Sequence, residues 1–510
     1  MSEKKSVNIT VISGDSVRKV TCSTDDYLLS VLRTEGFFVN ANCSGKGICG
    51  KCKVRCKPGT RISKLDRAHL SDHEIISGVR LACALKPTEG LVVYAQEDDK
   101  LASTDDYTEN FVRAGDELYL AIDIGTTTIA ERLVNTDGSI VGTAVFNNPQ
   151  RIYGADVVSR QSAATKGKAE NMRLLLTLKI KEDTETLLEK AEVSPEKIKK
   201  CAIACNTTMG HILMGFDCST LGVHPFTPVN IDKITKPFNE IFEGSKITAD
   251  TVLMPGISTY VGGDIVAGIY DTDIINSDSL CLLIDLGTNG EMALGNKDKI
   301  LTASAAAGPA FEGGNIACGT GSIPGAINSA CIAGGRIVCS TVGGEPVRGI
   351  CGTGVIDVTA SLVQTGLLDK AGFFHEDYEE LGYPLTRDGK YRFIQDDIRQ
   401  VQLAKSAVRS GIETLMERYG CTAGDIENIY VAGGFSRNIN IKNAATIGII
   451  PKEFTEKAKC IGNSALNGAV KYLLNADGDE FIEKIKAIST EITLADDDLF
   501  NDLFIDNITF

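Results

Sequence analysis

The sequence predicts a multidomain protein of mixed α/β and α+β class, with a small cysteine-rich domain followed by a larger, two-lobed one. Two observations support this fold class. Cys43, Cys49 and Cys52 fall within ten residues and have glycines between them. Further along, an apolar strand that runs into Asp-x-Gly-Thr occurs twice, at Asp123 and again at Asp285. A repeat at this separation indicates two similar halves of one domain.

The composition narrows the class of protein. A chain of 510 residues has room for roughly two to four domains, and 43% hydrophobic residues are enough to build their cores. The net charge of −15, the 6% aromatic content and the lack of tryptophan disfavour a nucleic-acid partner. Sixteen cysteines without a secretory signal favour reduced thiols and metal ligation. Because no apolar run is long enough to span a bilayer, we expect a cytoplasmic protein without membrane contact.

The cysteine-rich segment has the pattern of an iron–sulfur loop. Plant-type ferredoxins hold a [2Fe–2S] cluster with a C-x₄-C-x₂-C loop and a distant fourth cysteine. Here the first gap is five residues, and Cys83 follows Cys52 after a gap of thirty. The glycines of the loop accept positive φ and let backbone N–H groups approach the sulfides. We therefore predict that Cys43, Cys49, Cys52 and Cys83 ligate the cluster.

Other interpretations of these thiols stay open. A zinc site normally uses two closely spaced cysteine pairs, and Cys83 has no neighbour of that kind. Cys56 is an alternative fourth ligand, but it follows Cys52 by only four positions on a short predicted strand. Free cysteine is commonly buried as a small apolar residue, and we expect this of Cys56.

The elements around the loop are those of a small β domain. Residues 7–22 alternate and turn at Gly14-Asp15, which predicts a β-hairpin. A helix through residues 28–32 and strands at 51–56 and 91–94 follow. Their order resembles a ferredoxin of the β-grasp type over residues 1–97. The polar, acidic residues 98–115 then predict a solvated linker.

Each Asp-x-Gly-Thr segment has the chemistry of a phosphate-binding turn. The glycine permits a tight turn whose N–H groups point at phosphate oxygens, and the threonine hydroxyls donate further hydrogen bonds. The aspartate holds Mg²⁺ through water or orients an attacking water. One such turn is a weak signal because ordinary hairpins share it, whereas two turns facing each other across a cleft are a strong one.

A third element completes the set. Residues 429–436 predict a strand that runs into Gly433-Gly434, where a nucleoside can lie against the backbone near a helix N-terminus. The three motifs, in this order, resemble the ATPase superfamily of acetate and sugar kinases, Hsp70 and actin. The resemblance implies two ribonuclease-H-like lobes, residues 116–278 and 279–475, with ATP and Mg²⁺ between them.

The same resemblance implies roles for individual residues. Asp123 and Asp285 become the catalytic groups that position Mg²⁺ and water. The residues that would contact the nucleotide are Gly125, Thr126, Thr127, Gly287, Thr288, Asn289, Gly433 and Gly434.

The remaining segments receive structural interpretations. Asn206 is expected to cap a helix, and so is Asp264. Cys201 and Cys205 read as small core residues, and His211 has no second ligand spaced to help it bind a metal. The same holds for His224. The acidic C-terminal residues 476–510 are expected to form a solvated tail, with a covering arm as the alternative.

An electron carrier joined to an ATP-dependent clamp resembles one family, the reductive activators of corrinoid proteins. The five- and thirty-residue cysteine gaps fit this family, and the likeness spans nearly the whole chain. Further segments that carry it are residues 148–156, 206–209, 285–291 and 308–313.

Three features depart from the pattern. The chain is short between its two domains, so a middle linking domain is expected to be missing or reduced. Glu131-Arg132 stands where an apolar pair is expected, and Phe435-Ser-Arg437 replaces a glycine-richer turn.

The resemblance implies an ATP-hydrolysing iron–sulfur oxidoreductase. One electron passes from a low-potential donor such as a ferredoxin or flavodoxin, through the cluster, to Co(II) of a corrinoid protein, restoring Co(I) for methyl transfer. ATP is needed because this reduction is uphill for a plant-type cluster near about −400 mV. The alternatives are an activator of a 2-hydroxyacyl-CoA dehydratase, which would not need residues 1–97, and a non-hydrolysing electron-transfer docking protein. The identity of the client and the donor, and a homodimeric state, stay open.

Overall fold

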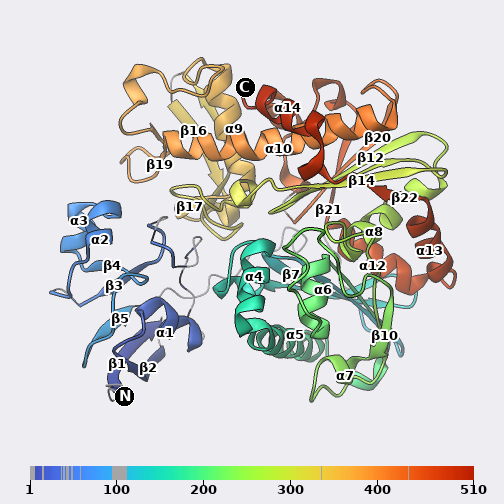
Figure 1. Cartoon of the computed structure of the whole chain (residues 1–510), viewed down its shortest axis with the longest axis horizontal. Coiled ribbons are helices and arrows are strands. Elements are labelled where there is room, and N and C mark those ends of the chain that lie inside the picture. The colour runs from blue at the N-terminus through green and yellow to red at the C-terminus, as the bar shows by residue number, and fades with distance from the viewer. Residues whose placement is uncertain are drawn as a thin grey trace. The chain divides into compact units, whose positions relative to one another are not determined.

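In the computed structural model, the described residues are 6–13, 16–35, 37, 39, 41, 45–47, 50–57, 59–94, 112–334, 336–434 and 436–510. The chain divides into two compact units (Figure 1). The first unit contains residues 1–100 together with 149–163, and the second contains residues 101–148 together with 164–510. None of the helices that the structure describes combines the length and the apolar composition needed to cross a bilayer.

The first unit is built on a five-stranded sheet with the order β2-β1-β5-β3-β4. β1 and β2 form an antiparallel hairpin, as the alternation predicts, and β5 pairs with β1 in parallel. The predicted turn residues Gly14 and Asp15 lie outside the described residues. Helix α1 buries Leu28, Leu29 and Leu32 in the core of this unit, which gives the β-grasp arrangement. The elements are β1 (Ser6–Ser13), β2 (Ser16–Ser23), α1 (Leu28–Thr34), β3 (Lys53–Cys56), α2 (Lys64–His69), α3 (Asp72–Ile76), β4 (Val79–Leu81), β5 (Val92–Tyr94) and α4 (Val157–Ala163).

The second unit begins with a six-stranded sheet of order β10-β11-β9-β6-β7-β8, the sheet of the first lobe. Strand β6 is largely apolar up to Asp123 because it lies inside the sheet, antiparallel to β7 and parallel to β9. The elements of this lobe are β6 (Leu118–Ile124), β7 (Thr128–Asn135), β8 (Ile140–Asn147), α5 (Ala169–Lys190), β9 (Ile198–Cys205), α6 (Thr207–Met214), β10 (Ile234–Pro237), α7 (Phe238–Ile241), β11 (Asp250–Leu253) and α8 (Gly263–Asp271).

The second lobe repeats this plan with a sheet of order β21-β20-β12-β13-β14-β22. Asp123 on β6 pairs with Ala130 and Ala204, and Asp285 on β12 pairs with Glu291 and Ala432 in the same antiparallel and parallel sense. The repeat in the sequence is therefore a repeat in the fold. The elements up to residue 474 are β12 (Leu280–Leu286), β13 (Gly290–Gly295), β14 (Ile300–Ala305), β15 (Ala326–Ala333), β16 (Arg336–Thr341), β17 (Gly349–Ile350), α9 (Gly352–Gln364), β18 (Tyr383–Pro384), β19 (Arg392–Phe393), α10 (Gln395–Tyr419), β20 (Ile426–Ala432), α11 (Ile441–Ile447), β21 (Ala458–Gly462) and α12 (Ser464–Leu474).

Helices α8 and α12 join the two sheets. α12 packs against α8 and also against β6 and β9, while α8 packs against β12 and β13. The helices approach closely because Gly468 faces α8, and a Cβ at this position would lie 2.0 Å from the carbonyl oxygen of Ala267. The functional turns at the ends of β6 and β12 therefore rest on a shared helical support.

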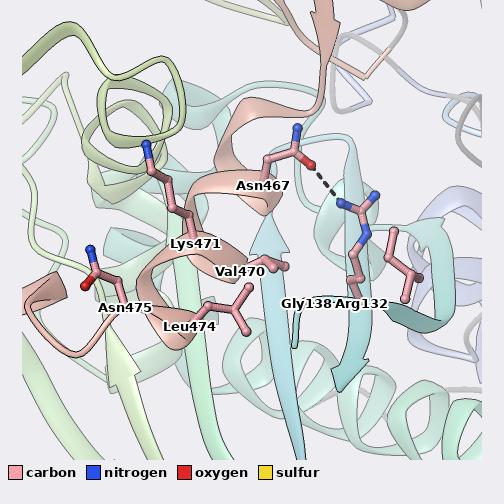
Figure 2. A pocket seen from close by; sticks show the side chains of 8 residues that line it. Arg132, Gly138, Asn467, Val470, Lys471, Leu474 and Asn475 are labelled. Atoms are coloured by element: carbon pink, nitrogen blue, oxygen red, sulfur yellow. Dashed lines mark hydrogen bonds between the residues drawn. The ribbon is translucent and has the colours of Figure 1, made fainter. Parts of the chain in front are cut away.

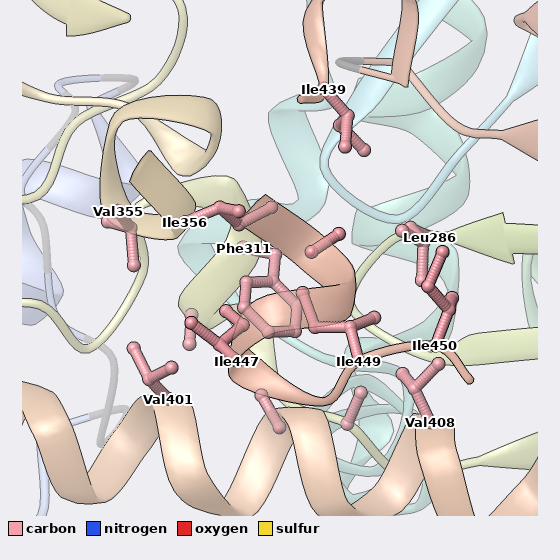
Figure 3. Close-up of a cluster of buried hydrophobic side chains, with 14 of the residues drawn as sticks. Leu286, Phe311, Val355, Ile356, Val401, Val408, Ile439, Ile447, Ile449 and Ile450 are labelled. Atoms are coloured by element: carbon pink, nitrogen blue, oxygen red, sulfur yellow. The ribbon is translucent and has the colours of Figure 1, made fainter. Parts of the chain in front are cut away.

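The main core of the second lobe lies between its sheet and helices α9, α10 and α11 (Figure 3). Phe311 sits in this core at 1% exposure, and Val355, Val401 and Ile449 belong to the same cluster. The buried Phe311 side chain anchors a short 3₁₀ helix, Pro309–Glu312, which brings Glu312 to the second phosphate turn.

The expectation of a solvated tail over residues 476–510 is wrong. Helix α13 (Gly478–Ile488) buries Ile482 and Ile485, and β22 (Ser489–Glu491) extends the second sheet in parallel with β14. Helix α14 (Asp498–Asp506) packs on α10, where the Asn507 Nδ2 donates to the Glu413 Oε2 at 2.7 Å. The acidic residues occupy exposed faces of these elements, and apolar residues between them anchor the segment.

Candidate nucleotide and iron–sulfur sites

The first phosphate turn joins β6 to β7. A Cβ at Gly125 would lie 2.8 Å from the carbonyl oxygen of Thr128, so the tight turn requires glycine. The Asn148 Nδ2 donates to the Gly125 carbonyl at 2.8 Å, and the Asn206 Nδ2 donates to the Thr126 Oγ1 at 3.1 Å. Asn206 also caps α6 as predicted, because its Oδ1 accepts from the backbone N–H of Met209 at 2.9 Å. Its side chain thus ties the turn to a helix N-terminus.

The second phosphate turn joins β12 to β13. The N–H of Gly287 donates to the carbonyl of Asn289 at 2.9 Å, which closes the turn. The side chain of Asn289 hydrogen-bonds to the carboxylate of Glu291. A Cβ at Gly287 would make only ordinary contacts, at 3.6 Å from the Asn289 carbonyl oxygen and 3.9 Å from the Glu312 Oε1, so this turn has room for a side chain.

The two turns meet through their threonines. The Oγ1 atoms of Thr127 and Thr288 lie 3.3 Å apart. Both hydroxyls donate to the same carboxylate oxygen, the Oε2 of Glu312, at 3.0 Å and 2.6 Å. The structure therefore brings the two predicted turns to one point, with two hydroxyl donors and an anionic acceptor between the lobes.

The Gly-Gly turn after β20 lies beside the second phosphate turn. Gly433 has φ of +118°, and a Cβ there would lie 2.3 Å from the carbonyl oxygen of Leu286. A Cβ at Gly434 would meet no heavy atom within 4 Å. The N–H of Gly433 donates to the Gly462 carbonyl at 3.0 Å, which fixes the turn against β21. Phe435 lies outside the described residues.

Four half-buried carboxylates gather at the base of the turns: Asp123, Asp264, Asp285 and Glu291. Burial is the main cause that raises the pKa of Asp123 to about 7, of Asp264 to about 6 and of Asp285 to about 8. Burial and then the charge of Asp264 also raise the pKa of Glu291 well above its usual range. The charge of Asp264 contributes to the shifts of Asp123 and Asp285 as well. Each of these charges disfavours ionisation of the others.

The Asp123 carboxylate receives one direct hydrogen bond from a third element. The Asn463 Nδ2, at the start of α12, donates to the Asp123 Oδ2 at 2.7 Å. This bond stabilises the ionised form and opposes the effect of burial on the pKa. The ionised form is the one that Mg²⁺ would need.

The carboxylates fit Mg²⁺ bound through water rather than directly. Among the residues that the structure describes, no three His, Cys, Asp or Glu side chains converge closely enough to hold a metal ion. In nucleotide sites, however, Mg²⁺ usually keeps several waters and takes one or two carboxylates together with phosphate oxygens. Asp123 and Asp285 are placed for such a role beside the two turns.

Several residues of this site were missed by reasoning from the sequence alone. Asp264 was expected to be a plain helix cap, but the N-cap of α8 is Gly262, and no side chain caps this helix. Asp264 lies in the first turn, where its Oδ1 accepts from the N–H of Ile265 at 2.9 Å, and its charge acts on Asp285. Glu291, Glu312 and Asn463 were assigned no role. Glu291 and Glu312 lie in segments that carry the family resemblance, which was the available signal.

In the first unit, the thiols of Cys52 and Cys83 are hydrogen-bonded to each other. A hydrogen bond from the Cys83 side chain, with backbone N–H groups of Cys52, Ala82 and Cys83, lowers the pKa of Cys52 to about 7 against the effect of burial. Both side chains are at least 92% buried. Burial instead raises the pKa of Cys56 to about 11, since it lies in the core. These contacts support Cys83 over Cys56 as a ligand. Cys43 and Cys49 lie outside the described residues.

Three described glycines of the loop around these thiols adopt the positive φ that the sequence predicts. Gly45, Gly47 and Gly50 have φ of +89°, +77° and +62°. Two further features position Cys83. The Oδ1 of Asp66 accepts from the N–H of Leu81 at 2.8 Å, and the guanidinium of Arg80 donates to the Thr60 carbonyl at 2.6 Å. The buried thiol pair and the glycine turns fit a [2Fe–2S] cluster.

Other candidate ligands have structural roles. The Nε2 of His211 accepts from the N–H of Val229 at 3.0 Å and its Nδ1 lies 2.8 Å from the Thr207 carbonyl, so both ring nitrogens are used. Burial raises the pKa of Cys201 to about 12 and raises the pKa of Cys205 well above its usual range, which keeps both thiols protonated. The prediction that these residues serve the core is confirmed.

The unexpected pair Glu131-Arg132 has partners on both sides of β7. The Thr184 Oγ1 donates to the Glu131 Oε2 at 3.0 Å, and the Arg132 Nη1 donates to the Asn467 Oδ1 at 2.7 Å.

Arg132 also lines a cavity of about 470 Å³ beside α12 (Figure 2). The cavity wall contains Arg132, Gly138, Ile140, Asn467, Val470, Lys471, Leu474 and Asn475. None of these residues belongs to a phosphate turn, so this cavity is separate from the candidate nucleotide site.

Comparison with known families matches the whole architecture. A family model described as the C-terminal domain of RACo, the ASKHA domain, matches residues 279–510, and one for the RACo middle region matches residues 118–277. A 2Fe–2S iron–sulfur cluster binding domain matches residues 12–88. The middle region thus corresponds to the first lobe. The expectation of a missing or reduced linking domain concerns the residues between the two predicted domains, most of which lie outside the described residues.

Individual relatives agree with the family match. The corrinoid activation enzyme RamQ of Eubacterium limosum is 31% identical over 416 residues, covering 77% of this chain and 70% of the relative. The [Co(II) methylated amine-specific corrinoid protein] reductase of Methanosarcina barkeri is 24% identical over 433 residues, covering 77% and 76%. A solved structure of a reductive activator for corrinoid,iron-sulfur protein superposes with a TM-score of 0.72 at 28% identity, covering 98% of both chains.

Proposed function

The chain belongs to the family of reductive activators of corrinoid proteins, and we propose that it couples ATP hydrolysis between its two lobes to one-electron reduction of Co(II) in a corrinoid client. The membership rests on the 31% identity to RamQ over most of both chains and on the family models along the sequence. The reaction is reductive activation, and the protein is an ASKHA ATPase with a 2Fe–2S domain. The assignment of steps to residues is the proposal.

The observation that carries the nucleotide assignment is the meeting of Thr127 and Thr288. Two repeated turns, one from each lobe, bring their hydroxyl groups to within 3.3 Å of each other. Hydroxyl and backbone N–H donors at facing hairpin turns suit the oxygens of a polyphosphate. A nucleotide phosphate held by both turns would stabilise one arrangement of the lobes over others.

The carboxylates supply the remaining chemistry of hydrolysis. Asp123 and Asp285 would hold Mg²⁺ through water, and either would orient the water that attacks the terminal phosphate. The Asn463 amide favours the ionised form of Asp123, against the effect of burial. Gly434 would face the adenosine, because the space beside its Cα is open.

In the first unit, Cys52 and Cys83 would hold one side of the cluster, with Cys43 and Cys49 as the other proposed ligands. A [2Fe–2S] cluster, when bound, supplies a one-electron carrier. The N–H groups directed at the Cys52 sulfur favour the thiolate, and hydrogen bonds to sulfur are one of the determinants of a cluster potential. The electron donor would be a low-potential ferredoxin or flavodoxin.

The need for ATP follows from the redox balance. The reduction potential of a plant-type cluster is about −400 mV. For a one-electron transfer, each ~59 mV of potential difference changes the equilibrium constant tenfold. Differential nucleotide binding of about 3 kcal/mol between two lobe arrangements would therefore offset a gap of about 130 mV. This is the scale that a conformational coupling supplies.

A reduction assay tests the proposal. The full chain is purified anaerobically, reduced, and mixed in excess with a corrinoid protein in its Co(II) state. The formation of Co(I) is followed by its visible spectrum. Two client proteins are compared, one specific for methylated amines and one corrinoid iron–sulfur protein. We expect Co(I) to form and phosphate to be released only with Mg²⁺ and ATP. Equal reduction without nucleotide, or a protein that holds no iron, would refute the proposal.

A further inference from the structure

Glu312 connects the two phosphate turns but has no role in the mechanism described above. Its Oε2 accepts one hydrogen bond from Thr127 at 3.0 Å and another from Thr288 at 2.6 Å. A threonine hydroxyl has a single hydrogen to donate. Because both hydroxyls donate their hydrogens to Glu312, the two hydroxyls, 3.3 Å apart, have no hydrogen left to form a hydrogen bond with each other. The carboxylate therefore holds the lobes together at this point.

The backbone that presents Glu312 is tightly fixed. Phe311, the preceding residue, is buried in the core of the second lobe (Figure 3). A Cβ at Gly352 would overlap the carbonyl oxygen of Phe311, at 1.6 Å. Gly313, the following residue, has φ of +78°, and a Cβ there would lie 2.1 Å from the carbonyl oxygen of Thr320. Within the second lobe, the carboxylate can therefore move only by rotation of its own side chain.

Glu312 and a nucleotide phosphate require the same donors. Each is an anionic oxygen that a hydroxyl hydrogen can satisfy, and neither hydroxyl has a second hydrogen to offer. Two anions in contact also repel each other in a site that already contains four carboxylates. Glu312 and the phosphate therefore cannot occupy the threonine pair together.

We propose that Glu312 is a phosphate surrogate: its carboxylate bridges Thr127 and Thr288 in the nucleotide-free protein and is displaced when the phosphate of a nucleotide binds there. The proposal rests on the proposed nucleotide site between the two turns. Glu312 is then a positioning residue that opposes nucleotide binding and preserves the geometry of the turns between catalytic cycles.

The test measures equilibrium binding of Mg²⁺-ATP and of adenosine to the full chain by calorimetry. Glu312→Gln removes the negative charge at nearly constant size. We expect the Kd of Mg²⁺-ATP to fall at least fivefold and the Kd of adenosine to stay the same, because adenosine has no phosphate to displace the carboxylate. Glu345→Gln removes the same charge from an exposed position of the same lobe and should leave both affinities unchanged.

The outcomes separate this inference from the proposed function. Wild-type protein that binds no Mg²⁺-ATP would refute the nucleotide site itself. Wild-type binding with an unchanged or weaker affinity in Glu312→Gln would refute only the surrogate role, as would a hundredfold loss of kcat at constant Kd. If Glu312→Gln does not fold, Glu312→Asp keeps the charge but shortens the reach to the two hydroxyls. It should also bind Mg²⁺-ATP more tightly, and weaker binding would overturn the proposal.

Discussion

Alanine at Gly433 should lower the stability of the fold, whereas alanine at Gly434 should weaken ATP binding. The two substitutions together test the Gly-Gly turn as a nucleotide site. At Gly433, alanine must adopt φ near +118° and place its Cβ 2.3 Å from the Leu286 carbonyl oxygen. A strained backbone position costs about 1–3 kcal/mol, and forced overpacking costs a similar amount. We therefore expect Gly433→Ala to lower the free energy of unfolding by about 3 kcal/mol.

Gly434→Ala should leave the fold intact and impair binding. An added Cβ would meet no heavy atom within 4 Å, and φ at Gly434 is outside the left-handed region. Surface substitutions of this kind change stability by about 0.5 kcal/mol or less. If the adenosine lies against this backbone, the methyl group would instead displace it and weaken ATP binding about tenfold, which is about 1.4 kcal/mol.

Two measurements on each variant decide the matter. Urea unfolding is followed by circular dichroism, because the chain has no tryptophan for fluorescence, and ATP binding is followed by calorimetry. A Gly434→Ala protein that binds ATP as the wild type does would refute the placement of adenosine at this turn. A Gly433→Ala protein with an unchanged urea midpoint would refute the close approach of the turn to β12.

Three further predictions address the cluster, the carboxylates and the C-terminal segment. Cys83→Ser should lower the iron content per chain and abolish the normal EPR signal, whereas Cys56→Ser should keep both; the reverse result would make Cys56 the fourth ligand. The carboxyl groups of Asp123 and Asp285 have pKa values of about 7 and about 8 in the folded chain, above the unfolded value of about 4. The folded state therefore binds more protons between about pH 4 and pH 8, and stability without Mg²⁺ and nucleotide should fall as pH rises through this window. Asp285→Asn should flatten the dependence measured by thermal unfolding, and an unchanged slope would contradict the shift. Removal of residues 476–510 should destabilise or aggregate the protein, because it removes β22 and leaves β14 as an unpaired edge of the second sheet; a truncated chain with wild-type stability would show that this segment is dispensable.

Local features of the sequence were sufficient for much of the fold. The apolar strand before Asp123, the glycine turn after it and the returning strand follow from residue properties over about fifteen positions, and the second copy at Asp285 repeats them. The hairpin at residues 6–23 and the cap at Asn206 are equally local. These features could be predicted because hydrogen bonding and side-chain periodicity in a strand or turn depend on near neighbours.

The composition of the site was decided by the tertiary structure. Asp264 comes from α8 and Asn463 from the start of α12, and only the packing of these helices between the sheets brings both to Asp123 and Asp285. Glu312 reaches the threonines because Phe311 is anchored in a core built from distant helices. The acidic C-terminal segment folds for a related reason: its apolar residues find partners on elements far away in the chain. Burial and charge at such points depend on long-range contacts, which the order of residues alone does not display.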